Sequence, residues 1–265
     1  MKRLLLLCIL SQTPLLQAET NNSPQVVITE AKLAPLPSGT DGRQGLSGGL
    51  SGGSLIQIGG VSADGKTVPE ALVLPLVGTN TSWNRTSLPE GRAWAATAQH
   101  GNEIVVAGGL IDGVPTARVT AYLWDGKSLA VRELTPLPSP VVGAGAAMLG
   151  EKLHVAGGMA SPADNTPRRD VLVIDLADPK STWKALPPLP GAGKVLPIVT
   201  GQYDLLEVIG GRTADGKGGF IATSDVWLHR SKPAEGTTVI GWSRAADVPV
   251  AMAAGKAAPS GQAHT

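Results

Sequence analysis

The chain has 265 residues, of which 34 are glycine and 21 are proline; 42% are apolar and 16% are charged. That apolar fraction excludes a disordered chain, and the many glycines and prolines favour short strands joined by turns over long helices. Because 22 basic residues stand against 21 acidic ones, no bulk charge attracts nucleic acid or a membrane surface, and we expect neither as a partner.

Residues 1–18 have the layout of a secretory signal peptide: basic Lys2-Arg3, an apolar run from Leu4 to Leu10, and a small residue at Ala18. We expect cleavage after Ala18 and a periplasmic or secreted protein. The run is too short to span a bilayer, so we expect no membrane insertion. The alternative is an apolar first strand. The chain's one cysteine, Cys8, lies in this segment, which leaves the mature protein without a disulfide or a thiol site.

The next residues introduce two markers that recur along the chain. Leu36-Pro37 comes first, followed by a glycine-rich stretch at 45–53 and by the apolar run 55–58, which ends in Gly59-Gly60. The double glycine returns at 108–109, 157–158 and 210–211, so the second glycines lie 49, 49 and 53 residues apart. The Leu-Pro pair returns in phase at 88–89, 137–138 and 189–190, with a Val-Pro pair at 248–249. We call these pairs the proline markers.

Each repeat holds a further short strand between the two markers, at 71–74, 121–125, 171–175 and 225–228, and Trp83, Trp183 and Trp242 precede three of the proline markers. These parts in this order, with a period near fifty, form the kelch pattern, which predicts an all-β fold, a β-propeller of four-stranded blades. We expect each double glycine to end a second strand at a crowded place that needs positive φ. We expect tryptophan to fill the wedge between blades. The glycines at 45–53 then lead into a first strand and are neither a linker nor a phosphate loop.

We expect the kelch propeller to cover residues 19–265, with about four blades and parts of others. Residues 25–44 carry a proline marker before any double glycine, which predicts an outer strand that closes the ring. The chain stops at His264-Thr265, in mid-repeat. Since open sheet edges are a liability, we expect the ring to be incomplete and the chain to be a fragment or a truncated reading frame.

A family resemblance rests on two segments. The segment Gly45-Leu46-Ser47-Gly48-Gly49-Leu50-Ser51-Gly52, followed by Ser54-Leu55-Ile56, resembles the Gly-Val-Ala-Gly-Gly-Phe-Ala-Gly…Ser-Leu-Ile strand of bacterial kelch-repeat sialic acid mutarotases, also called N-acetylneuraminate epimerases. Gly91-Arg92-Ala93-Trp94 is similar to that family's Gly-Arg-Ala-Tyr, one blade later. The arrangement most resembles the circularly permuted branch, over residues 30–265. The resemblance implies an isomerase without a cofactor, which interconverts the α and β anomers of N-acetylneuraminate, a small-molecule sugar acid.

Two departures from the family bear on the catalytic residues. The family has a long insertion after its first double-glycine strand, whereas here only residues 61–70 separate Gly60 from the next strand. The family's Gly-Glu…Pro-Gly-X-Arg motif, whose Glu and Arg are its implicated catalytic pair, occurs nowhere in the chain. In the permuted branch that motif lies in the last blade, beyond Thr265. The catalytic residues are therefore unknown.

The loops after the two markers open on one face, because the second and fourth strands of a blade end on the same side. Four of the five loops after the proline markers carry a cation, namely Arg43, Arg92, Lys194 and Lys256, with Asp41 and Glu90 as the acids. Arg212 joins this face directly after Gly211. Because arginine offers a planar fork to a carboxylate, we predict that Arg92 and Arg212, with Arg43 and Lys194, bind the sugar acid. The alternative is a set of solvated loop charges.

Mutarotation moves a proton between the ring oxygen and the anomeric hydroxyl, a step for a carboxylate or a histidine within hydrogen-bond reach. Asp64, Asp112, Asp164 and Asp215 lie in loops of that face, but we expect them to shape turns. His100 and His154 have no second histidine at ligand spacing, so we predict structural roles for both, no metal site and no cofactor. The alternative function is a non-catalytic kelch propeller that binds a carbohydrate or a protein outside the cytoplasm.

Overall fold

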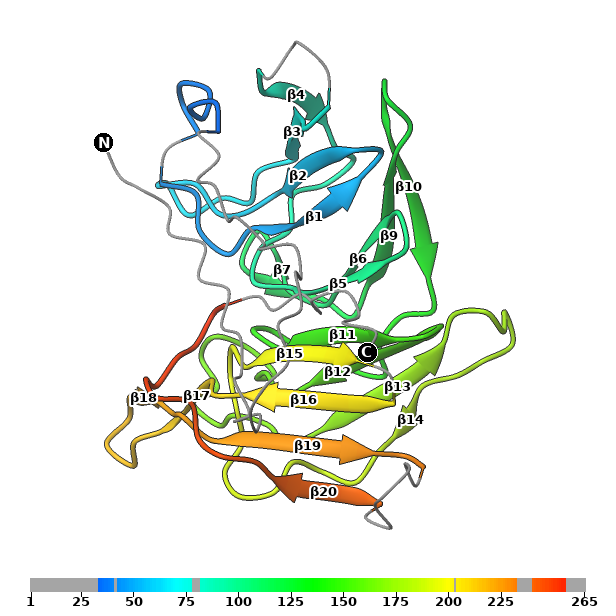
Figure 1. Cartoon of the computed structure of the whole chain (residues 1–265). Helices are drawn as coiled ribbons and strands as arrows, with labels where there is room; N and C mark the ends of the chain where they lie inside the picture. Colours follow the sequence, from blue (N-terminus) through cyan, green and yellow to red (C-terminus); the bar gives the residue numbers. More distant parts are fainter. Residues whose placement is uncertain (1–32, 41, 78–81, 203, 233–239, 256–265) are drawn as a thin grey trace, which may run out of the picture. The chain divides into compact units, whose positions relative to one another are not determined.

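Four antiparallel sheets make up the part of the chain that the structure, a computed structural model, describes: residues 33–40, 42–77, 82–202, 204–232 and 240–255. Each sheet has four strands in chain order (Figure 1), and we call the sheets blades 1 to 4. Blade 1 holds β1 (Ser47–Ser51), β2 (Ser54–Ile58), β3 (Glu70–Pro75) and β4 (Asn84–Ser87); blade 2 holds β5 (Ala96–His100), β6 (Glu103–Ala107), β9 (Val119–Trp124) and β10 (Leu129–Leu134). Blade 3 holds β11 (Gly145–Leu149), β12 (Lys152–Ala156), β13 (Val171–Asp175) and β14 (Lys184–Ala185); blade 4 holds β15 (Ile198–Gln202), β16 (Leu205–Ile209), β19 (Val226–Arg230) and β20 (Gly241–Arg244).

Two short hairpins lie between the second and third strands of blades 2 and 4. The first pairs β7 (Leu110–Ile111) with β8 (Val114–Pro115), and the second pairs β17 (Arg212–Ala214) with β18 (Phe220–Ala222). The described residues contain no helix. The predicted all-β kelch propeller of four-stranded blades is therefore confirmed.

The second strand of every blade ends directly before a double glycine, as predicted, and both glycines of each pair have φ between 56° and 94°. A Cβ on Gly59 would lie 2.2 Å from the carbonyl oxygen of Arg92, and the N–H of Gly60 donates to that same oxygen at 2.8 Å. The other three double glycines bond the carbonyls of Val141, Lys194 and Met252 in the same way. The crowding neighbour is thus the backbone of the next repeat, and a side chain at this place would push two repeats apart.

The first strands of consecutive blades pack side by side, β1 on β5, β5 on β11 and β11 on β15. Just before these strands, single residues tie each repeat to the preceding one. The N–H groups of Trp94, Gly143, Leu196 and Ala254 donate to the carbonyls of Gly45, Trp94, Gly143 and Leu196, at 2.6 to 2.9 Å. All five residues have positive φ, which non-glycine residues rarely adopt. We call this chain of hydrogen bonds the backbone ladder.

Apolar side chains alternate between the two faces of each sheet, so every blade boundary has its own core. Val105 of β6 packs toward blade 3, whereas Ile104 and Val106 pack toward blade 1. The predicted tryptophans Trp183 and Trp242 tie blade 3 to blade 2 and blade 4 to blade 3, since their indole N–H groups donate to the carbonyls of Thr135 and Pro187, at 3.1 and 2.8 Å. The indole N–H of Trp83 donates to the carbonyl of Ala34, in the segment before blade 1, at 3.0 Å. Each of these carbonyls lies two residues before the leucine of a proline marker.

Several predicted features lie outside the described residues: the signal peptide at 1–18, residues 25–32 of the closing strand, and the end of the chain at Thr265. Residues 33–40 run as an irregular segment with a turn. Closure of the ring, export and truncation therefore stay predictions. Within the described part of the chain, no helix is long and apolar enough to cross a bilayer.

Candidate functional site

The loop face, which we define as the loops that follow the double glycines and the proline markers, is held together by short backbone pairings. Gln44 pairs with Val61, Ala93 with Leu110, Val142 with Met159, and Val195 with Arg212. The residues directly before these pairings are therefore equivalent in the four blades, and they are Arg43, Arg92, Val141 and Lys194. Three of the four predicted cations occupy this one repeated position.

Arg43 and Lys194 each bind an acid of their own blade. Arg43 Nη2 lies 2.6 Å from Glu70 Oε1, and Lys194 Nζ lies 2.5 Å from Asp225 Oδ1. Burial acts to raise the pKa of Asp225, but hydrogen bonds from Lys194, Thr223 and Trp227 outweigh it and hold that pKa below its ordinary value. Both pairs tie the loop after a proline marker to the start of the third strand.

Arg92 is enclosed within blade 2, where it is 2% exposed. Its Nη2 donates to Glu90 Oε1 at 2.6 Å and to Thr120 Oγ1 at 2.9 Å, and its Nη1 donates to the carbonyls of Val106 and Arg118, at 3.3 Å each. Its Nε is buried and has no hydrogen-bond partner among the residues that the structure describes. The side chain ties its loop to β6 and β9, so its charge faces the interior of the blade.

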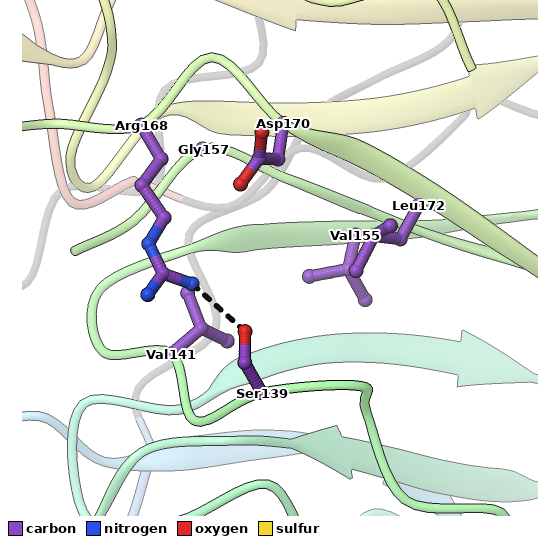
Figure 2. Close-up of a pocket in the computed structure, with 7 residues that line it drawn as sticks. All are labelled: Ser139, Val141, Val155, Gly157, Arg168, Asp170 and Leu172. Carbon is purple, nitrogen blue, oxygen red and sulfur yellow. Dashed lines mark hydrogen bonds between the residues drawn. The ribbon is translucent and has the colours of Figure 1, made fainter. Parts of the chain in front are cut away.

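Blade 3 has a valine where the other blades have a cation. A cavity of about 30 Å³ lies beside Val141 and is also lined by Asp170 (Figure 2). Arg168 reaches back to the loop after the proline marker, where its Nη1 lies 3.2 Å from Ser139 Oγ (Figure 2). The same atom lies 3.2 Å from the carbonyl oxygen of Pro140. Since a space of this size holds a single water molecule, the missing cation leaves a void too small for a sugar.

Arg212 differs from the other three predicted cations because its side chain is exposed, at the start of β17. It has no side-chain hydrogen bond or ion pair with any other described residue. The structure does not bring Arg212 together with Arg92, which is enclosed in blade 2. Lys256 and Asp41 lie outside the described residues. That the four predicted cations bind a carboxylate stays a prediction. Among them, Arg212 is the residue whose side chain is exposed and has no ionic partner within the described residues.

Three of the four loop aspartates, Asp64, Asp164 and Asp215, bond groups of their own turns, as expected, whereas Asp112 bonds a residue of the preceding repeat. Asp215 accepts the backbone N–H groups of Lys217 and Gly219, at 2.7 and 2.8 Å, and these bonds lower its pKa. Asp64 accepts from the hydroxyl of Ser62 at 2.5 Å, which lowers its pKa. Asp164 accepts the N–H of Thr166, and Asp112 accepts from Thr67. All four carboxylates thus serve as hydrogen-bond acceptors within the loop face.

The histidines and one further acid lie in strands. His154 is 4% exposed, and burial lowers its pKa to about 4. His100 lies within ion-pair distance of Glu151 and Glu103, at 2.8 and 3.6 Å. Burial raises the pKa of Glu207, in the middle of β16. Glu207 lines neither the small cavity of blade 3 nor the groove of blade 4. Both histidines have the structural surroundings that the sequence predicts.

A groove of about 480 Å³ opens on blade 4. Its lining includes the Lys194–Asp225 pair, Trp227 of β19, Thr213 of the hairpin, Ser224, and Arg244 and Asp247 at the end of β20. Because ligand sites commonly have volumes of about 300–1,000 Å³, we take this blade-4 groove as the candidate binding site. Among the charged residues of the groove, the repeat pattern predicts only Lys194 as a binding residue. The sequence feature that could have indicated Arg244 and Asp247 is their spacing of three residues.

Comparison with known proteins supports the fold. A solved structure, "Structure of YjhT", matches with a TM-score of 0.67 and 17% identity, over 84% of this chain and 76% of that chain. At this identity the likeness shows the kelch-type propeller fold alone. No family profile matches the chain, and no curated protein does. The mutarotase family and its permuted branch therefore remain a resemblance in sequence.

Proposed function

We propose that this kelch propeller is a sialic acid mutarotase-like protein, which binds N-acetylneuraminate and speeds the interconversion of its α and β anomers. The observation that carries the proposal is that the two sequence segments that resemble the mutarotase family meet in the fold. The N–H of Trp94 donates to the carbonyl of Gly45 at 2.8 Å. A Cβ on Gly45 would lie 2.7 Å from the indole Cδ2 of Trp94, so this contact requires glycine. The two matches thus belong to one feature of the fold.

The proposed chemistry needs neither a metal nor an organic cofactor. The anomeric hydroxyl loses its proton, the bond from the anomeric carbon to the ring oxygen breaks while that oxygen gains a proton, and the open-chain ketone recloses on its other side. One group must take a proton and another must give one, and a cation must hold the sugar carboxylate. Arg212 supports the last requirement because it is exposed and unpaired within the described chain. The proton-transfer groups are unassigned, because the family's Glu and Arg motif is absent from the sequence.

The test follows N-acetylneuraminate freshly released as the α anomer by a sialidase, using proton NMR to record its decay to equilibrium. We expect the rate constant to rise in proportion to the protein concentration, and a lower rate constant in the variant Arg212→Gln would assign the carboxylate to Arg212. Lys217→Gln is the matched control, since it removes an exposed cation from the same β17–β18 hairpin. A rate constant that stays at its spontaneous value at every protein concentration rejects catalysis by this chain.

A non-catalytic propeller that binds a sugar outside the cytoplasm is the second candidate. It is favoured by the engagement of Arg43, Arg92 and Lys194 in bonds within their own blades. Under this candidate, saturation-transfer NMR detects binding while the anomers interconvert at the spontaneous rate. Both candidates include export, which mass spectrometry of the mature protein tests: an N-terminus near Glu19 supports export, and a mature protein that keeps Lys2 rejects it.

A further inference from the structure

The blade-4 groove has a floor that is fixed by hydrogen bonds. The Nζ of Lys194 donates to Thr223 Oγ1 at 2.7 Å and to Asp225 Oδ1 at 2.5 Å, while the indole N–H of Trp227 donates to Asp225 Oδ2 at 2.7 Å. Asp225 therefore accepts on both oxygens, and its charge is directed into the floor. Because an ammonium has three donors, these two bonds use two of the N–H groups of Lys194, whose side chain is only 4% exposed.

Arg244 is held in place at the side of the groove but keeps free donors. Its guanidinium lies over the Trp227 ring, 5.8 Å from the ring centroid, and its Nη2 lies 2.8 Å from Asp247 Oδ1. The second oxygen of Asp247 lies 3.3 Å from the hydroxyl of Ser224. Nε and Nη1 of Arg244 have no partner within the described residues, and the side chain is 54% exposed. The two fixed contacts thus leave donors at Nε and Nη1 available on an ordered side chain.

We propose that the blade-4 groove binds the sugar acid, with the free donors of Arg244 on its carboxylate in place of Arg212, which does not line the groove, and with Trp227 against the apolar face of its pyranose ring. This inference rests on the proposed function, whose ligand it adopts. A guanidinium that is already ordered loses little freedom when it binds a carboxylate through a charge-assisted hydrogen bond. The carboxylates of Asp225 and Asp247 accept hydrogen bonds from residues of the groove wall. They therefore repel the ligand's carboxylate less than two unpaired carboxylates would. Thr213 and Ser224, which also line the groove, offer hydroxyl groups for the sugar hydroxyls.

The test measures the affinity of the full chain for N-acetylneuraminate, by NMR titration and by quenching of tryptophan fluorescence. Arg244→Gln should weaken binding about tenfold or more, the effect of losing one charge-assisted hydrogen bond. Arg230→Gln is the matched control, because Arg230 also pairs with an aspartate of blade 4, Asp204 at 3.0 Å, but does not line the groove. N-acetylmannosamine, a neutral amino sugar, should bind at least tenfold more weakly than the sugar acid, for the same reason.

The outcomes separate this inference from the proposed function. Loss of affinity in Arg244→Gln but not in Arg230→Gln supports the groove, whether or not the protein speeds anomer exchange. Equal affinity in both variants overturns the groove, even if anomer exchange is still accelerated. Equal binding of the neutral sugar overturns the assignment of the carboxylate to Arg244. If the unaltered protein binds no N-acetylneuraminate, this inference is wrong, and the anomer-exchange rate decides the proposed function separately.

Discussion

Lys194 Nζ lies 2.5 Å from Asp225 Oδ1, and the two side chains are only 4% and 18% exposed. The pair joins the loop that leads into blade 4 to the start of β19, as the pair of Arg43 and Glu70 does in blade 1. A charge buried by folding is costly once its partner is removed. The stability of blade 4 should therefore depend on this single contact.

Lys194→Met should lower the free energy of unfolding by about 3 kcal/mol, because it leaves the carboxylate of Asp225 enclosed without its cation. Urea unfolding at pH 7 measures the loss. Lys194→Arg keeps the charge and should lose less than half as much. Arg244→Gln is the control for a surface pair and should cost less than about 1 kcal/mol. A cost for Lys194→Met no larger than that of the control would show that the pair does not stabilise the blade.

Gly157→Ala should destabilise the protein far more than Gly150→Ala does. Both glycines have positive φ, 71° and 56°, so both substitutions carry the backbone cost of about 1–2 kcal/mol. A Cβ on Gly157 would also lie 2.5 Å from the carbonyl oxygen of Lys194, whereas a Cβ on Gly150 meets nothing within 4 Å. Forcing two repeats apart adds about 1–3 kcal/mol. Thermal and urea unfolding of the two variants measures the difference, and equal losses would contradict the role of the double glycine as a contact between repeats.

Val141→Lys should create in blade 3 an ion pair like those of Arg43 with Glu70 in blade 1 and of Lys194 with Asp225 in blade 4, with Asp170 as its partner. Asp170 lines the small cavity beside Val141 (Figure 2). The pairing is tested by a double-mutant cycle of Val141→Lys and Asp170→Asn, whose coupling free energy should be about 1 kcal/mol. Urea unfolding of the four proteins gives this value. A coupling that is zero within error would mean that the lysine does not reach Asp170 and that the position is not equivalent to Lys194.

His154 should make the protein less stable as the pH falls from about 6.5 to about 4. Burial lowers its pKa from 6.5 to about 4 in the folded protein, so within this window the unfolded chain binds a proton that the folded chain does not, and the free energy of unfolding falls with pH. The loss from this group amounts to roughly 3 kcal/mol. His154→Gln removes the titration, so the difference in stability between pH 7 and pH 4 should shrink by that amount. Parallel pH profiles for the two proteins would contradict burial of a neutral imidazole.

The repeat could be predicted from the sequence because its markers occupy positions that few other residue types can occupy. A double glycine with positive φ admits few other residues, and Trp183 and Trp242 are large enough to cross a blade boundary. The Asp-Gly tip at 215–216 likewise indicated the turn between β17 and β18. Each of these features depends on residues that are close in the sequence or that recur at a fixed spacing, so it can be recognised without knowing the fold.

The partners of the loop cations could not be predicted in the same way. Arg43 and Glu70 lie 27 residues apart, and Lys194 and Asp225 lie 31 apart, so their meeting depends on the register of a whole blade. A cation in a loop has the same appearance in the sequence whether it faces solvent or an acid. The groove was missed for a related reason: Trp227 and Arg244 come from adjacent strands and meet only because those strands pair, Trp227 opposite Arg244.

The backbone ladder has a direction, since every donor belongs to a later repeat and every acceptor to an earlier one, from Trp94 on Gly45 to Ala254 on Leu196. A ribosome delivers the earlier repeat first. Each newly made repeat therefore meets an acceptor that is already in place, and it needs no segment from further along the chain to dock. Assembly can proceed in the order of synthesis, and a docking failure at one boundary leaves the repeats before it able to stay folded, as in proteins whose units couple only to their nearest neighbours.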